Sequence, residues 1–283
     1  MGIHDLLPFL QKYAKEGIKP YDEWCKSQNK LILAIDTPIF MHKYAYSVGT
    51  GKSLCVRMLK FANDLIEKNI EPIFVFDGKK LEDKEIECNK RILALHSANN
   101  RFKMRKVEIN NEEYEVERTC IGTKPLYEDY EALKESLKLL NIEICVAQYE
   151  AEALCSYLVK SGRASAVLTE DTDAIAYLSD AVILKWNSDN EIVVLIDEIC
   201  SSLDLQQNQF QELCVLFGND FNDRLKGIGP VKALALIKKF NSLENYLLKE
   251  TSINELQQSK MRKSMKIFSC FCYENIITSN LIE

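Results

Sequence analysis

Short apolar runs that end at acidic residues constrain the fold of this chain more than any other feature. Residues 31–35 lead into Asp36, and residues 72–76 lead into Asp77. Between them, residues 54–69 carry apolar side chains at helical spacing. Strand, helix and strand at this spacing predict a βαβ unit in a parallel sheet. Ligands bind at the carboxyl ends of strands in such sheets, so we expect both aspartates at a functional edge.

Two further apolar runs are followed by paired carboxylates. Residues 142–146 precede Glu150 and Glu152, and a second pair, Asp171 and Asp173, follows another short run. Residues two apart diverge within a helix, but they can converge in its first turn, where one is still non-helical. Carboxylates at neighbouring strand ends repel one another, and hard divalent cations are their usual partners. The pattern therefore predicts a divalent-metal site.

Residues 79–118 differ from the rest of the chain, because they are mostly charged and give few strand signals. Basic residues cluster there, notably at 101–106. A solvated helical surface accounts for most of these charges. The alternative is a helical element that lies over the site and contacts phosphates.

Amphipathic patterns predict further elements after this charged region. Residues 126–140 indicate a helix whose apolar stripe is formed by Leu133, Leu137 and Leu140. The strands expected at 182–184 and 192–195 would then form a hairpin that turns near residues 188–190.

From residue 207 the pattern is helical. Residues 227–230, Gly-Ile-Gly-Pro, precede an Ala, Leu and Lys-rich helix that extends to about Phe240. Backbone N–H groups at such a helix start can bind a phosphate, although the same residues also suit a plain helix–helix turn. Four lysines stand near this turn: Lys226, Lys232, Lys238 and Lys239. They favour a nucleic-acid backbone as the partner.

Taken in order, these motifs resemble the flap endonuclease and exonuclease-one family, the XPG-type structure-specific 5′ nucleases. The resemblance covers roughly residues 1–245, begins at Met1-Gly2-Ile3, and includes Gly218-Asn219-Asp220. It implies a PIN-like α/β fold, with a mostly parallel central sheet flanked by helices, a helical arch and a C-terminal helix-two-turn-helix region.

The resemblance also implies a division of the chain into three regions. Residues 1–105 would form an N-terminal nuclease region with the gateway and arch helices. Residues 120–245 would form an internal nuclease region with a DNA-binding hairpin near 218–240. Residues 246–283 would be a helical tail, in which the sequence indicates no chemistry.

The family's functional residues carry over to matching positions. Seven acids are implied to hold two Mg²⁺ ions, for which Mn²⁺ can substitute: Asp36, Asp77, Glu150, Glu152, Asp171, Asp173 and Asp220. Lys84 and Arg91 match a basic pair that contacts the scissile phosphate. The implied DNA contacts are Gly2, His42, Lys226, Gly227, Gly229 and Lys232. His42 matches a residue that lies against a substrate nucleotide, although a lone histidine is as readily structural. Carbonyl groups of the hairpin would hold a K⁺ ion.

The implied reaction is cleavage of DNA phosphodiesters at 5′ flaps, nicks or ends, in replication, repair or recombination. Two metal ions about 4 Å apart would activate a water and stabilise the leaving 3′-oxygen. The expected partner is branched or nicked duplex DNA with a 5′ single strand, bound by a monomer. The sequence contains no sliding-clamp box of the Gln-x-x-Leu/Ile-x-x-Phe-Phe kind and no basic C-terminal stretch.

Composition excludes several classes. The 283 residues are 47% hydrophobic and 28% charged, which is typical of a globular protein. No apolar run approaches the ~20 residues of a membrane span, and the start lacks a signal-peptide pattern. Ten scattered cysteines without a CxxC pair, with three histidines, argue against zinc and for reduced thiols inside a cell. The location would be nuclear for a cellular protein and a cytoplasmic replication site for a viral one. The net charge of −6 argues little against DNA, because without the seven acids the chain is close to neutral.

Two alternatives stay open. Asp171-Thr172-Asp173 after a strand also resembles the Asp-x-Asp motif of phosphohydrolases, but that function leaves Asp36, Asp77 and Glu150 without a role. A non-catalytic DNA-binding or assembly module on the same scaffold would bind DNA without metal and without cleavage.

Overall fold

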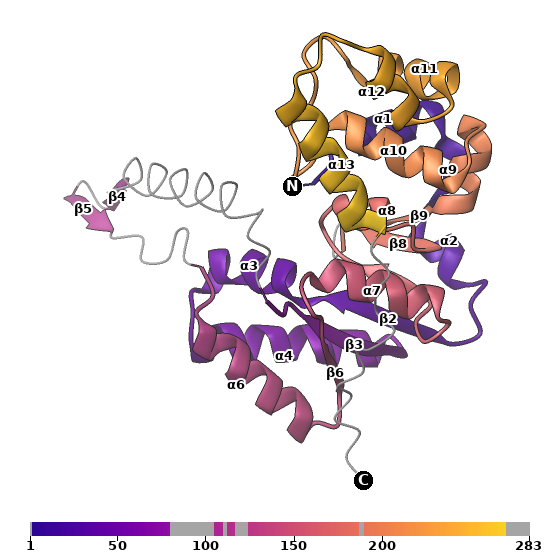
Figure 1. Ribbon diagram of the computed structural model, residues 1–283. Helices are drawn as coiled ribbons and strands as arrows, with labels where there is room; N and C mark the ends of the chain where they lie inside the picture. Colours follow the sequence, from indigo (N-terminus) through magenta and orange to yellow (C-terminus); the bar gives the residue numbers. More distant parts are fainter. Residues whose placement is uncertain (1, 80–104, 110–111, 117–123, 187–189, 270–283) are drawn as a thin grey trace.

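The structure of the chain, a computed structural model, describes residues 2–79, 105–109, 112–116, 124–186 and 190–269 (Figure 1). Within these residues, the organising element is a seven-stranded sheet with the order β1-β9-β8-β7-β2-β3-β6. Its strands are β1 (Ile18–Pro20), β2 (Leu31–Asp36), β3 (Ile70–Phe76), β6 (Glu143–Val146), β7 (Ala166–Leu168), β8 (Ala181–Leu184) and β9 (Ile192–Leu195).

The strand order reverses next to β2. The chain proceeds from β2 to β3 and β6 on one side, and then returns to place β7 and β8 on the other side. These neighbours all pair in parallel, whereas β9 is antiparallel to both β8 and β1. The predicted α/β fold with a mostly parallel sheet is confirmed, as is the hairpin of β8 and β9. The carboxyl ends of β2 and β7 mark the switch point, where open α/β sheets form their binding crevice.

Helices cover both faces of this sheet (Figure 1). One face packs against α3 (Thr37–Val48), α4 (Lys52–Glu67) and α6 (Tyr127–Leu139), and the other packs against α7 (Ala151–Lys160). The core therefore consists of two clusters of buried apolar residues, a first one on the α3, α4 and α6 face and a second one on the α7 face. Side chains alternate along β2, so Leu33 and Ile35 belong to the first cluster and Ala34 to the second. No helix of the described residues is long and apolar enough to cross a bilayer.

A helical group continues the second cluster beyond the sheet (Figure 1). Its members are α1 (Leu6–Tyr13), α8 (Asp173–Ala176), α9 (Ile196–Leu203), α10 (Gln207–Phe217), α11 (Pro230–Phe240), α12 (Leu243–Lys249) and α13 (Glu255–Ser269). The short α2 (Tyr21–Cys25) packs beside β1 and β9. The helices predicted from residue 207 onward are confirmed in α10 and α11; α12 begins at Leu243, just before the proposed tail, and α13 lies within it.

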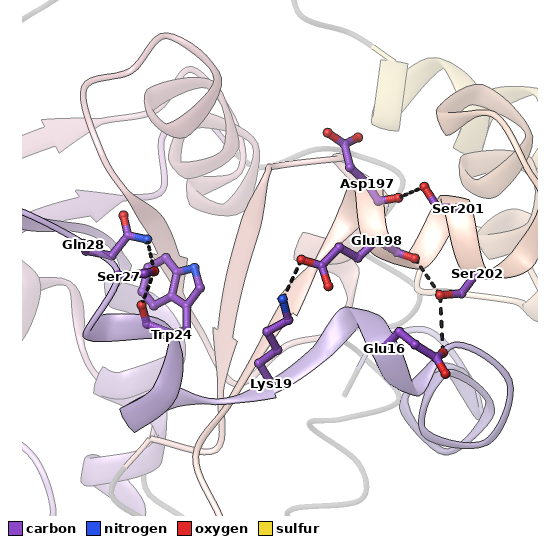
Figure 2. A network of polar contacts seen from close by, with 9 residues as sticks. All are labelled: Glu16, Lys19, Trp24, Ser27, Gln28, Asp197, Glu198, Ser201 and Ser202. Carbon is purple, nitrogen blue, oxygen red and sulfur yellow. Dashed lines mark hydrogen bonds and ion pairs between the residues drawn. The ribbon is translucent and has the colours of Figure 1, made fainter.

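The N-terminal segment is fixed to α9 by polar contacts (Figure 2). Lys19 Nζ forms an ion pair with Glu198 Oε1 at 2.7 Å, and Ser202 Oγ donates to Glu16 Oε2 at 3.5 Å. Because β1 also pairs with β9, the segment between α1 and β1 is attached at both ends. This attachment holds the start of the chain against the helical group.

The purely helical expectation for residues 79–118 is wrong at its end. Strands β4 (Arg105–Ile109) and β5 (Glu112–Val116) form an antiparallel hairpin that projects from the body (Figure 1). Both segments alternate charged residues with β-branched or aromatic ones, a pattern that favours strands. The sequence between them is Asn-Asn, and asparagine is favoured in two-residue hairpin connections.

The predicted apolar stripe of α6 is correct for two of its three residues. Leu133 and Leu137 are fully buried, whereas Leu140 is 57% exposed. The helix ends at Leu139, so Leu140 caps it and its side chain no longer follows the helical repeat.

Candidate active site

The acidic residues predicted from sequence follow neighbouring strands. Asp36 is the last residue of β2, and Asp77 comes directly after β3. Glu150 is the N-cap of α7, after β6, and Asp173 begins α8, after β7. The strands lie side by side in the order β7, β2, β3, β6 and run in parallel. Their carboxyl ends, and therefore these acids, meet at one edge of the sheet.

Thr169 connects the acids on either side of the switch point. Its Oγ1 donates to Asp36 Oδ2 at 2.7 Å and accepts the N–H of Asp171 at 3.0 Å. The N–H of Asp173 in turn donates to Asp171 Oδ1 at 3.1 Å. Asp36, Asp171 and Asp173 are 3%, 5% and 1% exposed, and Thr169 is fully buried. One hydroxyl therefore joins the carboxylate of Asp36 to the backbone of Asp171, which is far away in sequence.

Asp77 is held by the start of α7. The N–H of Ala151 donates to Asp77 Oδ1 at 2.8 Å, which satisfies a backbone donor at the helix start. The pairing of β3 with β6 continues past Asp77, since the N–H of Gly78 donates to the carbonyl of Tyr149 at 2.8 Å. A Cβ on Gly78 would lie 2.0 Å from the carbonyl oxygen of Ala147, so only glycine fits there.

Glu150 and Glu152 take the arrangement that their spacing allows. Glu150 has extended backbone angles as the N-cap of α7, and Glu152 stands in the first turn. Glu152 is only 9% exposed, and a carboxylate so buried is usually paired. The non-helical N-cap lets the two side chains approach the same edge.

Residues 2–4, at the start of the chain, lie between the loop that carries Asp171 and the turn that carries Asp220. Gly2 has φ +90°, and a Cβ there would lie 2.2 Å from Asp171 Oδ1. Two residues on, the N–H of His4 donates to the carbonyl of Gly218 at 3.1 Å, and Arg224 Nη2 donates to the carbonyl of His4 at 2.9 Å. The start of the chain thus brings the turn that carries Asp220 to the same side as Asp171.

The negative charge of these acids helps to raise the pKa of two nearby groups, Cys155 and Tyr130. Burial raises the pKa of the Cys155 thiol well above its usual value, and the charges of Asp36, Glu152 and Asp77 raise it further. Burial, followed by Asp77 and Asp36, raises the pKa of the Tyr130 phenol. Tyr130 lies on a helix predicted from its amphipathic pattern, but no sequence motif pointed to a place beside the acids.

The residues of this edge fit a hard divalent cation. Their donors are carboxylate oxygens, which Mg²⁺ and Mn²⁺ prefer, and most are buried. Crowding like charges away from water is unfavourable unless a cation compensates. Among the described residues, no group of three or more His, Cys, Asp or Glu side chains lies close enough together to hold a metal ion by itself. Mg²⁺ suits such a site, because it keeps several waters and needs few direct protein ligands.

An ion pair between Lys43 and Glu170 on this edge was not predicted from the sequence. Lys43 of α3 forms an ion pair with Glu170, and its Nζ also donates to the carbonyl of Trp186 at 3.3 Å. Both contacts are long-range, so no local pattern indicated them. They tie α3 to the loop that carries Asp171.

The predicted DNA contacts lie on accessible parts of the chain. His42 is exposed on α3, and Lys226 and Lys232 are exposed near the start of α11. Gly227 has φ +77°, Gly229 is the N-cap of α11, and no heavy atom lies within 4 Å of a Cβ built on either. Lys84 and Arg91 lie outside the described residues. The roles of all these residues stay predictions.

The reversed strand order and the row of acids define a PIN-like nuclease. Residues 1–98 match the XPG N-terminal domain, and residues 141–220 match the XPG I-region. Flap endonuclease 1 of Entamoeba dispar is 32% identical over 266 residues, which cover 87% of this chain and 69% of that protein. The chain therefore belongs to the flap endonuclease family of XPG-type structure-specific 5′ nucleases, whose members are generally metal-dependent.

Other relatives agree with this assignment. Flap endonuclease 1 of Encephalitozoon cuniculi is 31% identical over 277 residues, covering 88% of this chain and 76% of that protein. The catalytic core of Rad2 in complex with DNA substrate has the same fold, with a TM-score of 0.65 at 20% identity over 93% of this chain and 79% of that one. The structure of flap endonuclease-1 from Methanococcus jannaschii has a TM-score of 0.62 at 19% identity, and the match covers 89% of this chain and 81% of that one.

Proposed function

We propose that this chain cleaves DNA phosphodiesters at 5′ flaps, nicks or ends, as an Mg²⁺-dependent nuclease of replication, repair or recombination. One observation carries the proposal: carboxylates from four adjacent strand ends gather at the switch point, where Thr169 bonds to both Asp36 and the Asp171 backbone. The names of the relatives support a flap substrate, and the Rad2 core was solved with DNA.

Seven acids would hold two Mg²⁺ ions: Asp36, Asp77, Glu150, Glu152, Asp171, Asp173 and Asp220. When bound, the ions supply a water activated for attack and stabilise the charge on the leaving 3′-oxygen. The chain's own groups fix the carboxylates in advance. Thr169 orients Asp36, and the N–H of Ala151 orients Asp77. Gly2 leaves room for the Asp171 carboxylate, because any larger residue would collide with it.

Other residues would bind and position the DNA. Lys84 and Arg91 would neutralise charge on the scissile phosphate, and His42 would lie against a nucleotide. The turn before α11 would bind the duplex backbone away from the cut, through the N–H groups of Gly227 and Gly229, with K⁺ held by carbonyl groups. Lys226 and Lys232 would add phosphate contacts there. Distance along the duplex, rather than base identity, would then set the cutting position.

The test compares wild type with Asp171→Asn on four labelled DNAs: a 5′ flap, a nicked duplex, a blunt duplex and a four-way junction. We expect wild type to cut the flap or nicked substrate in Mg²⁺ and to release a 5′-phosphate, with no cutting in EDTA. Asp171→Asn should bind the same DNA with similar affinity, measured by fluorescence anisotropy in Ca²⁺, and lose cleavage.

Each rival function predicts a different result. A non-catalytic DNA-binding module would bind DNA without cutting in any divalent ion. An Asp-x-Asp phosphohydrolase would hydrolyse a small phosphoester, such as p-nitrophenyl phosphate, in preference to branched DNA. Full cleavage by Asp171→Asn would refute the assignment of the acids.

A further inference from the structure

Helix α13 contacts both loops that carry the acids on the β7 side of the site. It lies along α10 and ends beside α8 (Figure 1). The Phe268 ring packs edge-on against Tyr177, which follows α8, at 5.1 Å between centroids. It packs in the same way against Phe221, which follows Asp220, at 5.8 Å. One side chain of α13 therefore contacts the neighbours of Asp173 and of Asp220.

A buried amide reinforces the contact with α8. Gln211 of α10 is 4% exposed, and its Nε2 donates to the carbonyl of Ala176 at 2.8 Å and to the carbonyl of Phe268 at 3.1 Å. Its Oε1 accepts from Ser269 Oγ at 2.9 Å. Ala176 is the last residue of the four-residue helix that Asp173 begins. Gln211 thus joins the end of α13 to the helix of one acid.

A second buried set of hydrogen bonds joins α13 to the Asp220 turn. Asn219 Oδ1 accepts the N–H of Phe221 at 2.9 Å, so the Asn219 side chain closes a turn around Asp220. Ser264 Oγ of α13 donates to the same Oδ1 at 3.1 Å. Asn219 Nδ2 donates to Asn222 Oδ1 at 2.9 Å. Ser264 is fully buried, and Asn219 and Asn222 are 8% and 4% exposed.

We propose that α13 is a positioning element of the nuclease site: Ser264 of α13, together with Gln211 of α10, which bonds to the end of α13, fixes the separation of Asp173 and Asp220. The inference rests on the proposed function, since both acids are assigned to the metal ions. Packing alone would attach the helix with apolar residues, whereas buried polar side chains are costly unless every bond is made. Groups that orient metal ligands from behind tune metal affinity strongly.

The experiment compares Ser264→Ala and Gln211→Met with wild type. Met261→Ala is the matched control, because Met261 lies on the same helix, is 1% exposed and has an apolar side chain. Three quantities are measured: Mn²⁺ affinity of the protein alone by calorimetry, the Mg²⁺ concentration for half-maximal cleavage, and KM for the DNA. Melting temperatures show how far each variant is destabilised.

We expect Ser264→Ala and Gln211→Met to weaken Mn²⁺ binding by roughly tenfold and to raise the Mg²⁺ requirement to match. KM for DNA should stay near the wild-type value. Met261→Ala should lower the melting temperature and leave the metal affinity unchanged. If Gln211→Met fails to fold, Ser264→Ala alone decides, because it removes a single hydroxyl.

Two results would overturn the inference. One is an unchanged metal affinity in Ser264→Ala, and the other is an equal loss in Met261→Ala, which would assign the effect to helix packing in general. The failure of the proposed function has a separate signature. Wild type would then cut no DNA, while the calorimetry would still report whether α13 sets the metal affinity.

Discussion

Replacing Thr169 with valine tests the central geometry most directly. Valine has nearly the same shape, so the change removes the hydroxyl and leaves the packing of this fully buried residue almost intact. Two hydrogen bonds disappear: the one to Asp36 Oδ2 at 2.7 Å and the one from the Asp171 N–H at 3.0 Å. A bond to a charged group contributes about 1.5–3 kcal/mol, and a buried donor left without its acceptor costs about 1–3 kcal/mol.

Thr169→Ser is the matched control, because it keeps the hydroxyl and loses one buried methyl group, at about 1 kcal/mol. We therefore expect Thr169→Val to lower the free energy of unfolding by about 2.5–6 kcal/mol, clearly more than Thr169→Ser. Urea unfolding in EDTA measures this difference without bound metal. Cleavage of a 5′-flap DNA over an Mg²⁺ titration then tests whether the change also impairs the role proposed for Asp36.

The two variants should therefore differ both in stability and in cleavage. If Thr169→Val is as stable and as active as Thr169→Ser, the hydroxyl does not organise the carboxylates, and the switch-point geometry has been misinterpreted. A stable but inactive Thr169→Val would show that the hydroxyl serves the site rather than the fold.

Three further predictions concern residues near the edge of the sheet. Gly2→Ala should reduce cleavage at least tenfold with little change in melting temperature, because a Cβ would lie 2.2 Å from Asp171 Oδ1. Wild-type activity in this variant would show that Gly2 does not lie against Asp171. Gly78→Ala should lower the free energy of unfolding by about 2 kcal/mol or more in urea titrations, since its Cβ would meet the Ala147 carbonyl at 2.0 Å. Lys43→Met removes a partly exposed ion pair and should cost no more than about 1 kcal/mol of stability. A larger loss, measured in the same titrations, would show that the pair is structural.

The sequence was sufficient to predict the frame of the site. Asp36 and Asp77 end short apolar runs, and two such runs separated by a helical pattern favour buried strands of a parallel sheet. The carboxyl ends of parallel strands share one edge, so the convergence of these acids follows from topology. The spacing of Glu150 and Glu152 allowed them to converge if one residue was still non-helical, and the structure makes Glu150 the extended N-cap of α7.

Other features could not be predicted, because they depend on contacts between distant residues. The bond from Thr169 to Asp36 spans 133 positions, and no local pattern distinguishes this threonine from any other. The link from Ser264 to Asn219 is equally non-local, which is why the tail gave no sign of a role in the site. Strands β4 and β5 were missed for a different reason, since their charged residues masked the alternation that favours a hairpin.

The reversal of strand order between β2 and β7 has a consequence for biosynthesis. Asp36 leaves the ribosome early, but its hydrogen-bond partner is made more than a hundred residues later, and the Asp220 turn and Ser264 follow later still. A growing polypeptide therefore contains β2, β3 and β6 before the residues that complete the proposed site have been made. On the proposed function, cleavage of nucleic acid would therefore require that synthesis has passed Ser264, so that α13 can pack behind the acids.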